Sequence, residues 1–225
     1  MSEIQMIVVL SLLGGALSVD ATAAFQIMLS QPLVAGSIAG AIVGDLGLGL
    51  AVGATLQLVW MGALPVGAAP FPDGAVAGVA GVGAGAILVR SGVPEGLAIA
   101  GAVVVGLCAG SAGQKVTSGV RRLNVRYSTL ARSRADDGDP QGVTAAVVLG
   151  LVTRFATAAL LAAVALSVSL LLRPLASVGA IGVFPTTLWA APIAAAAIAA
   201  GGRAKSEATY IVAGLAAGLA FVLLV

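Results

Sequence analysis

The sequence predicts an all-α membrane protein, a polytopic bundle of transmembrane helices that includes broken or re-entrant half-helices. Of its 225 residues, 60% are hydrophobic and only 9% are charged. A soluble domain is about half apolar and about one quarter charged, so this chain has more apolar surface than a water-soluble fold can bury. Eight apolar segments follow one another, and a proline-rich stretch interrupts them. That interruption predicts irregular backbone inside the bundle.

The apolar segments differ in length, and the short ones predict half-helices. Crossing about 30 Å of hydrocarbon takes about 20 helical residues. Segment 33–44 would reach only about 18 Å, and Gly44 and Asp45 can close a tight hairpin to the next segment. The predicted helical segments are Ile4–Val19, Leu33–Gly44, Leu46–Leu64, Gly74–Val89, Gly96–Gly113, Val143–Leu172, Leu175–Ala200 and Ala208–Val225.

The stretch from Pro65 to Asp73 contains too many prolines to remain helical. At membrane depth, irregular backbone is tolerated only inside protein or beside a water-filled cavity. Transporters commonly place their substrate beside such broken helices. We therefore expect this stretch to lie within the protein at bilayer depth and to line a polar chamber.

Basic residues are concentrated in the middle of the chain, which predicts a cytoplasmic segment there by the positive-inside tendency. This segment divides a single domain into N-terminal helices with the candidate site (1–114), a cytoplasmic basic loop (115–142) and C-terminal helices (143–225). No nucleic-acid partner is expected, because only Tyr127 supplies an aromatic ring among the basic residues. The clustered residues are Lys115, Arg121, Arg122, Arg126, Arg132 and Arg134.

Many of the 31 glycines are spaced four residues apart, as in Gly36 and Gly40 or Gly49 and Gly53. A stripe of small residues lets helix backbones approach closely in lipid. Tight packing within the chain is the first interpretation, and an oligomer interface is the alternative.

Several kinds of catalytic site are excluded by composition. The chain has no histidine, and Cys108 is its single cysteine. Disulfides, Cys/His metal sites and imidazole-based triads therefore cannot form within it. We predict no catalytic residue, no metal and no cofactor, and we expect Cys108 to be a small buried packing residue.

Four ionisable residues stand in apolar surroundings and are functional candidates for that reason: Asp20, Asp45, Asp73 and Arg154. Structural roles are open beside the functional ones. Asp45 can cap a hairpin, and Asp73 can cap the glycine-rich helix that follows it. Arg154 can be interfacial or the buried partner of a carboxylate.

Gln26 and Gln57 are uncharged amides that both donate and accept hydrogen bonds, as recognition of sugar hydroxyls requires. For Gln57 a hydrogen bond between helices is an equal alternative. Trp60, one turn further on, can offer its ring face to a sugar, with anchoring or packing as the alternative.

Several short motifs together resemble the membrane subunit IIC of the mannose/fructose/sorbose-type bacterial sugar phosphotransferase system. Phe25-Gln26 lies just upstream of them. The motifs are Gln31-Pro32-Leu33, Gly44-Asp45, Gly53-Ala54-Thr55-Leu56-Gln57, Gly67-Ala68-Ala69 and Pro72-Asp73-Gly74-Ala75.

This resemblance implies a multi-pass permease of the bacterial cytoplasmic (inner) membrane that moves a hexose inward by alternating access. It also implies a membrane partner, subunit IID, and cytoplasmic IIA and IIB proteins, with IIB supplying the phosphohistidine that phosphorylates the sugar. We expect the chain to work as an oligomer. The substrate region implied here falls on Gln26, Gln57 and Asp73, with Asp45 at a hairpin turn.

Two alternatives remain open. The family commonly has glutamate where Gln57 stands, asparagine where Pro65 stands, and acidic residues where this chain has Ala23 and Ala24. These differences motivate a transport-silent scaffold or sensor of the same fold. An ion-coupled secondary carrier that uses Asp45 or Asp73 is the other alternative.

Overall fold

The computed structural model describes residues 1–61 and 70–177, and all regular structure in these ranges is helical. This confirms the all-α class. The elements are α1 (Glu3–Thr22), α2 (Pro32–Val43), α3 (Leu46–Val59), α4 (Gly74–Arg90), α5 (Glu95–Asp136), α6 (Pro140–Ser169) and the 3₁₀ helix η1 (Leu170–Ser177).

The described helices fall into the two predicted length classes. Three are long and apolar enough to cross a membrane, namely α1, α5 and the α6 segment that continues to Pro174. Helices α2, α3 and α4 are apolar but shorter. The predicted segment Ala208–Val225, nearly all of Leu175–Ala200 and the end of Leu46–Leu64 lie outside the described residues.

Helix α4 is the centre of the described part of the bundle, since it contacts each of the other five α-helices in that part. Its residues from Ala75 to Leu88 are all buried, and most of them are glycine, alanine or valine. Small side chains allow this approach: a Cβ atom built on Gly81 would lie 2.9 Å from the carbonyl oxygen of Ala102 in α5. Because the side chains of α4 are small, the neighbouring helices pack close to its backbone.

Helices α2 and α3 form the predicted tight hairpin. Gly44 has φ of +86°, a left-handed conformation that glycine adopts without strain. Asp45 then caps α3, accepting a hydrogen bond from the Leu48 amide at 2.9 Å. A Cβ atom on Gly40 would lie 2.7 Å from the Asp45 carbonyl oxygen. For this pair of helices the glycine spacing serves close packing within the chain.

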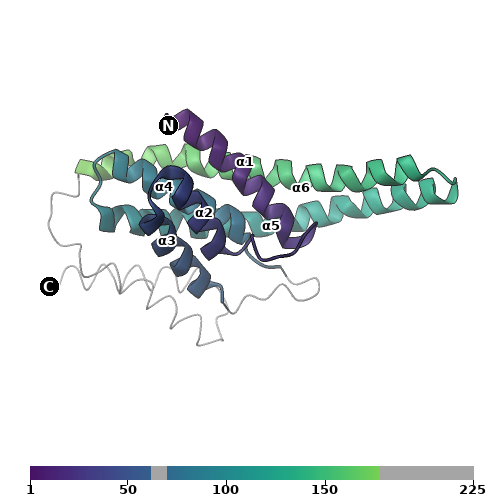
Figure 1. Cartoon of the computed structure of the whole chain (residues 1–225), viewed down its shortest axis with the longest axis horizontal. Helices are drawn as coiled ribbons and strands as arrows, with labels where there is room; N and C mark the ends of the chain where they lie inside the picture. The colour runs from purple at the N-terminus through teal and green to yellow at the C-terminus, as the bar shows by residue number, and fades with distance from the viewer. Residues whose placement is uncertain (62–69, 178–225) are drawn as a thin grey trace.

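Helices α5 and α6 form a long antiparallel hairpin that extends beyond the other helices (Figure 1). The prediction of a basic loop at 115–142 is wrong, because α5 continues as a helix to Asp136. Residues 115–136 are hydrophilic but contain no proline and several good helix formers, and they pack along α6. After about 20 residues have crossed the bilayer, the rest of α5 extends about 30 Å further.

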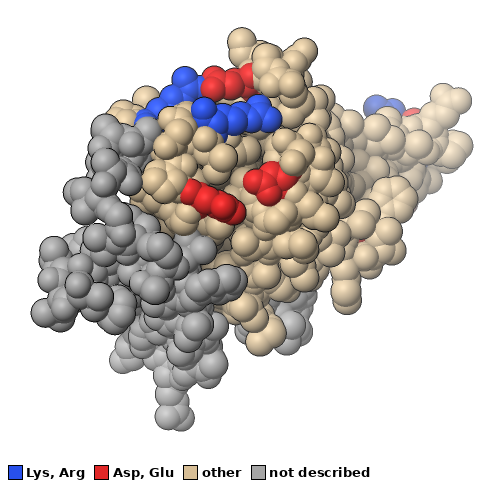
Figure 2. Space-filling model, turned by 60° about the vertical axis from the view of Figure 1, so that its left-hand side comes forward, with Lys and Arg blue, Asp and Glu red and all other residues tan. Residues whose placement is uncertain are grey.

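The two ends of the bundle differ in charge. At the end away from the hairpin tip, Arg173 pairs with Glu3, and Arg90 donates to the carbonyl oxygens of Met1 and Val43. Figure 2 brings this end forward and shows acidic and basic side chains side by side there. Because the hairpin is the basic end, its cytoplasmic orientation remains the prediction that the charges favour.

One packing expectation is wrong. Cys108 is exposed on the outer face of α5 instead of being buried. The sequence context is apolar on both sides of this residue, so hydropathy alone does not distinguish a core-facing position from an outer one in a membrane helix.

Candidate functional site

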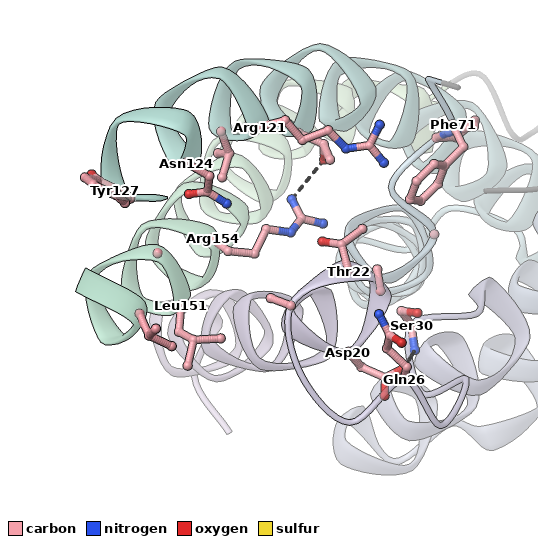
Figure 3. Close-up of a pocket in the computed structure, with 18 of the residues that line it drawn as sticks. Asp20, Thr22, Gln26, Ser30, Phe71, Arg121, Asn124, Tyr127, Leu151 and Arg154 are labelled. Carbon is pink, nitrogen blue, oxygen red and sulfur yellow. Dashed lines mark hydrogen bonds between the residues drawn. The ribbon is translucent and has the colours of Figure 1, made fainter. Parts of the chain in front are cut away.

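A cleft of about 1090 Å³ opens between the end of α1, the start of α4 and the base of the α5–α6 hairpin (Figure 3). Its walls are polar on both sides, although the helices that form them are largely apolar. Lining residues from the α1 side include Asp20, Thr22, Gln26, Ser30 and Gln31. Those from the hairpin include Thr117, Arg121, Asn124, Tyr127, Ser128 and Arg154, and Trp60 and Phe71 add aromatic rings.

A buried ion pair lies at the base of this cleft. The Nη2 atom of Arg154 lies 2.8 Å from Oδ2 of Asp73, and the two side chains are 2% and 1% exposed. Arg154 also donates to Thr117 Oγ1 at 2.9 Å and to the Ser18 carbonyl oxygen at 3.2 Å. The Ser18 hydroxyl donates to Asp73 at 3.0 Å. Four helices, α1, α4, α5 and α6, therefore meet at one polar junction.

Asp73 is held in place by its position at the first turn of α4. Its Oδ1 accepts from the Val76 amide at 3.2 Å, and its own amide donates to the Gly110 carbonyl oxygen at 3.0 Å. Gly113 makes room for it, because a Cβ atom there would overlap the Asp73 side chain. The predicted N-cap role is thus confirmed, and the negative charge is favourable at a helix N-terminus.

Arg154 is the buried partner of a carboxylate, which decides between the two roles left open for it. Pro72 and Asp73 are also buried, so the end of the proline-broken stretch lies inside the protein. Residues 62–69, which include Pro65, lie outside the described residues.

Asp20 organises the loop between α1 and α2. Its side chain, 3% exposed, accepts hydrogen bonds from the amides of Ile27 at 2.8 Å and Ser30 at 3.1 Å. This loop contains left-handed backbone at Phe25, Gln26 and Met28, with φ values of +65°, +57° and +69°. Non-glycine residues adopt such φ values at a cost, so the carboxylate holds a strained loop in shape. Gln26, in this loop, lines the cleft.

Gln57 is connected to the cleft through Gln31. The Nε2 atom of Gln57 donates to Oε1 of Gln31 at 3.1 Å, which joins α3 to the start of α2. Gln31 lines the cleft, whereas Gln57 does not. The Oε1 atom of Gln57 is buried and has no hydrogen-bond partner among the described residues. A buried acceptor in this state is available to a ligand hydroxyl.

The structure brings three of the four candidate substrate residues to one region. Gln26 lines the cleft. Asp73 forms an ion pair with the lining residue Arg154, and Gln57 forms a hydrogen bond with the lining residue Gln31. Asp45 is not among the lining residues and caps α3 instead.

Sequence reasoning did not find Ser18 and Thr117, which complete the buried junction. Serine and threonine in membrane helices more often bond to their own backbone. Neither residue is therefore conspicuous in the sequence.

Comparison with known proteins finds a matching family model and several curated relatives. The family model described as "PTS system sorbose-specific IIC component" matches residues 3–174, which contain the six described α-helices. The fructose permease IIC component of Bacillus subtilis (strain 168) is 34% identical over 64% of this chain and 50% of that protein. The mannose-specific EIIC component of Escherichia coli (strain K12) is 30% identical over 51% of this chain and 40% of that protein. The chain thus spans about half the length of these curated relatives or less.

Solved structures agree in fold. A cryo-EM structure of the mannose transporter ManYZ in complex with microcin E492 has a chain that is 24% identical, with a TM-score of 0.57. The match covers 95% of this chain and 84% of that one. A chain described only as a membrane protein has a TM-score of 0.65 at 23% identity, covering 96% and 86%. At these identities the likeness concerns the fold of the helical bundle.

Proposed function

Because the chain belongs to the family of sorbose-specific IIC components of the phosphotransferase system, we propose that it is the sugar-translocating membrane subunit of a mannose/fructose/sorbose-type system. In this proposal it carries a hexose inward by alternating access, and a separate IIB protein phosphorylates the sugar. Its partners are the membrane subunit IID and the cytoplasmic IIA and IIB proteins. It lies in the bacterial inner membrane and crosses it several times.

The polar cleft is the observation that supports this function most strongly. Sugar sites combine side chains that bind hydroxyl groups with an aromatic ring that packs against the sugar. Asp20, Gln26, Gln31 and Trp60 offer this combination among the residues that line the cleft. Gln57 extends it, because its buried Oε1 can accept from a hydroxyl group once the sugar displaces Gln31.

In this proposal Asp73 acts on the sugar site indirectly. Its ion pair fixes Arg154, whose side chain forms part of the cleft wall. Asp45 contributes by closing the α2–α3 hairpin that carries Gln57. The substrate region is therefore proposed at Gln26 and Gln57, with Asp73 and Asp45 in supporting positions.

The direction in which the cleft opens fits an inward-open state. Its walls come from the end of α1 and from the portion of the hairpin that follows Thr117 in α5. That portion is the basic one, which the positive-inside tendency assigns to the cytoplasm. A sugar in this cleft would be accessible to a cytoplasmic IIB protein.

Sugar uptake tests the proposal in cells that express this chain with IIA, IIB and IID proteins. The expected product is intracellular hexose phosphate. Gln26→Ala and Gln57→Ala should each reduce uptake about tenfold, the effect of losing about 1.4 kcal/mol of hydrogen bonding. Gln141→Ala removes an exposed amide at the far end of the hairpin and should leave uptake unchanged.

Two outcomes would contradict the proposal. Unchanged uptake in both Gln26→Ala and Gln57→Ala would remove the site assignment. Unmodified sugar accumulating under an ion gradient would instead indicate an ion-coupled carrier. The structure offers little support for that alternative, because Asp45 caps a helix and Asp73 is paired with Arg154.

A further inference from the structure

The base of the cleft carries hydrogen-bond donors that the ion pair with Asp73 leaves unused. A guanidinium group has five N–H donors. In Arg154 the Nε atom donates to the Ser18 carbonyl oxygen, and Nη1 donates to Thr117 Oγ1. The Nη2 atom donates to Oδ2 of Asp73. One N–H on Nη1 and one on Nη2 therefore remain without an acceptor among the described residues.

Thr117 adds a further donor at the same place. Its Oγ1 accepts from Arg154 at 2.9 Å, and within the described ranges its own O–H meets no acceptor. Serine and threonine in helices commonly donate to the carbonyl oxygen four residues earlier, as Ser118 and Thr153 do here. Thr117 makes no such bond, so its O–H can turn toward a ligand. A hydroxyl group that accepts from a cation is polarised and donates more strongly.

These donors belong to the surface of the cleft although their side chains are buried. Arg154 and Thr117 both line it, at 2% and 5% exposure. Figure 3 shows Arg154 extending from α6 into the space between α1 and α5, with its hydrogen bond to α5 dashed. Because protein acceptors occupy the other edges of the guanidinium group, the cleft is the side from which an acceptor can reach the remaining donors.

The two side chains are preorganised for binding. Ser18, Thr117 and Asp73, from three different helices, already hold Arg154, so a ligand does not have to immobilise it. Hydrogen bonds from a charged donor are stronger than neutral ones, and low exposure strengthens them further. All the unused groups at this place are donors. They are complementary to an oxygen that accepts, and each sugar hydroxyl group has two lone pairs.

We propose that Arg154 and Thr117 form the floor of the sugar site and donate to one hydroxyl oxygen of the hexose. That hydroxyl group acts as an acceptor, whereas hydroxyl groups that face Gln26 and Gln31 can donate as well as accept. Asp73 does not touch the sugar and only positions Arg154. This inference rests on the proposed function, because it assumes that a hexose occupies the cleft.

The expected consequence is selection for the hydroxyl group that faces the floor. A site with donors for a substrate hydroxyl group rejects an analogue that lacks it, because the donors are then left unpaired. Removing that one hydroxyl group should weaken binding to the wild-type chain about tenfold or more. Fluorine at the same carbon accepts a hydrogen bond but cannot donate one, so it should recover at least a threefold part of the loss.

Calorimetry on the full-length chain in phosphatidylcholine nanodiscs tests this selection. The probes are mannose, fructose and sorbose, each with its monodeoxy analogues and the matching deoxyfluoro analogues. The readout is the deoxy penalty, which is the ratio of the affinities of the parent hexose and one deoxy analogue for the same variant. A general loosening of the fold weakens both affinities and leaves this ratio unchanged.

Two variants should reduce the deoxy penalty at the carbon that faces the floor to about threefold or less. Thr117→Val removes the O–H and keeps the branched shape of the side chain. Arg154→Lys keeps a positive charge beside Asp73 and loses the planar fork of donors. Thr117→Ser keeps the hydroxyl group and should keep the full penalty.

Thr157→Val is the matched control on α6. It also replaces threonine by valine, but the Thr157 hydroxyl group donates to the carbonyl oxygens of Thr153 and Arg154, and Thr157 does not line the cleft. Its deoxy penalty should stay within twofold of wild type. A reduction equal to that of Thr117→Val would overturn the inference, because the effect would then not depend on the floor.

The remaining outcomes separate this inference from the proposed function. A penalty within twofold of wild type in Thr117→Val, and in Arg154→Lys if that variant folds, would overturn the floor even if both bind hexose more weakly. Hexose binding to wild type without a penalty for any deoxy analogue would also remove only this inference. Absence of binding by all three hexoses would contradict the proposed sugar site and the floor together.

Discussion

Separating Asp73 from Arg154 should destabilise the junction of four helices by an amount that a double-mutant cycle can measure. Asp73→Asn keeps the shape of the side chain and its capping of α4, because asparagine is as good an N-cap as aspartate. It removes the negative charge and the Oδ2 atom that accepts from Arg154, and leaves the guanidinium of Arg154 2% exposed without its counter-charge. Breaking a buried pair in this way costs about 3–5 kcal/mol.

Arg154→Met removes the positive charge of the same ion pair. It leaves the Asp73 carboxylate 1% exposed, although the Ser18 hydroxyl and the Val76 amide still donate to it. We therefore expect a cost at the lower end of the range, about 3 kcal/mol. In the double variant neither buried charge is left alone, so the total cost should stay near that of one single variant. The coupling energy is then about 3 kcal/mol.

The measurement is the free energy of unfolding of the full-length chain, followed by circular dichroism as mixed micelles are titrated with dodecyl sulfate. The cycle requires wild type, both single variants and the double variant under one set of conditions. Additive costs, with a coupling below about 0.5 kcal/mol, would refute the view that the two buried charges stabilise each other.

Three further outcomes are expected. Asp20→Asn should speed hydrogen exchange at the amides of Ile27 and Ser30 by about tenfold, because a neutral side-chain amide accepts hydrogen bonds more weakly than a carboxylate. Unchanged exchange rates would contradict the role of Asp20 in the loop. Gly113→Ala should destabilise the chain by about 1–3 kcal/mol, because the new Cβ would overlap the Asp73 side chain. Gly119→Ala, at a position with open space, should not destabilise it. Equal unfolding free energies in the two variants would count against close packing of Gly113 on Asp73. Gly40→Ala should cost a similar amount by separating α2 from α3, since its Cβ would lie 2.7 Å from backbone; a thermal unfolding midpoint equal to that of wild type would rule this out.

Helix starts were the most predictable feature of the fold. Segments 33–44 and 74–89 agree with α2 and α4 to within one or two residues at each end. Proline, glycine and aspartate at these boundaries have local steric and capping reasons that do not depend on tertiary structure. The length of α5 was not predicted, because hydrophilic residues were interpreted as a loop although they form a helix that packs on α6.

The sequence predicted which residues belong to the candidate site better than it predicted how they contact one another. Asp73 and Arg154 are conspicuous because ionisable residues are rare in apolar segments. Their pairing joins positions 81 residues apart and depends on how α4 packs against α6. Gln57 bonds to Gln31, so the alternative of a contact between helices is realised at that residue. Its role toward a sugar remains a proposal.

Protection of a cysteine in the cleft by sugar is the most direct test of the claim that the cleft is the sugar site. In a Cys108→Ser background, Thr22→Cys places a thiol on the lining, and Thr129→Cys places one on the exposed surface of α5 away from it. A transported hexose should slow maleimide labelling of the Thr22→Cys variant at least threefold and leave the Thr129→Cys variant unaffected. Equal labelling rates of the Thr22→Cys variant with and without mannose, fructose and sorbose would contradict a sugar site in this cleft.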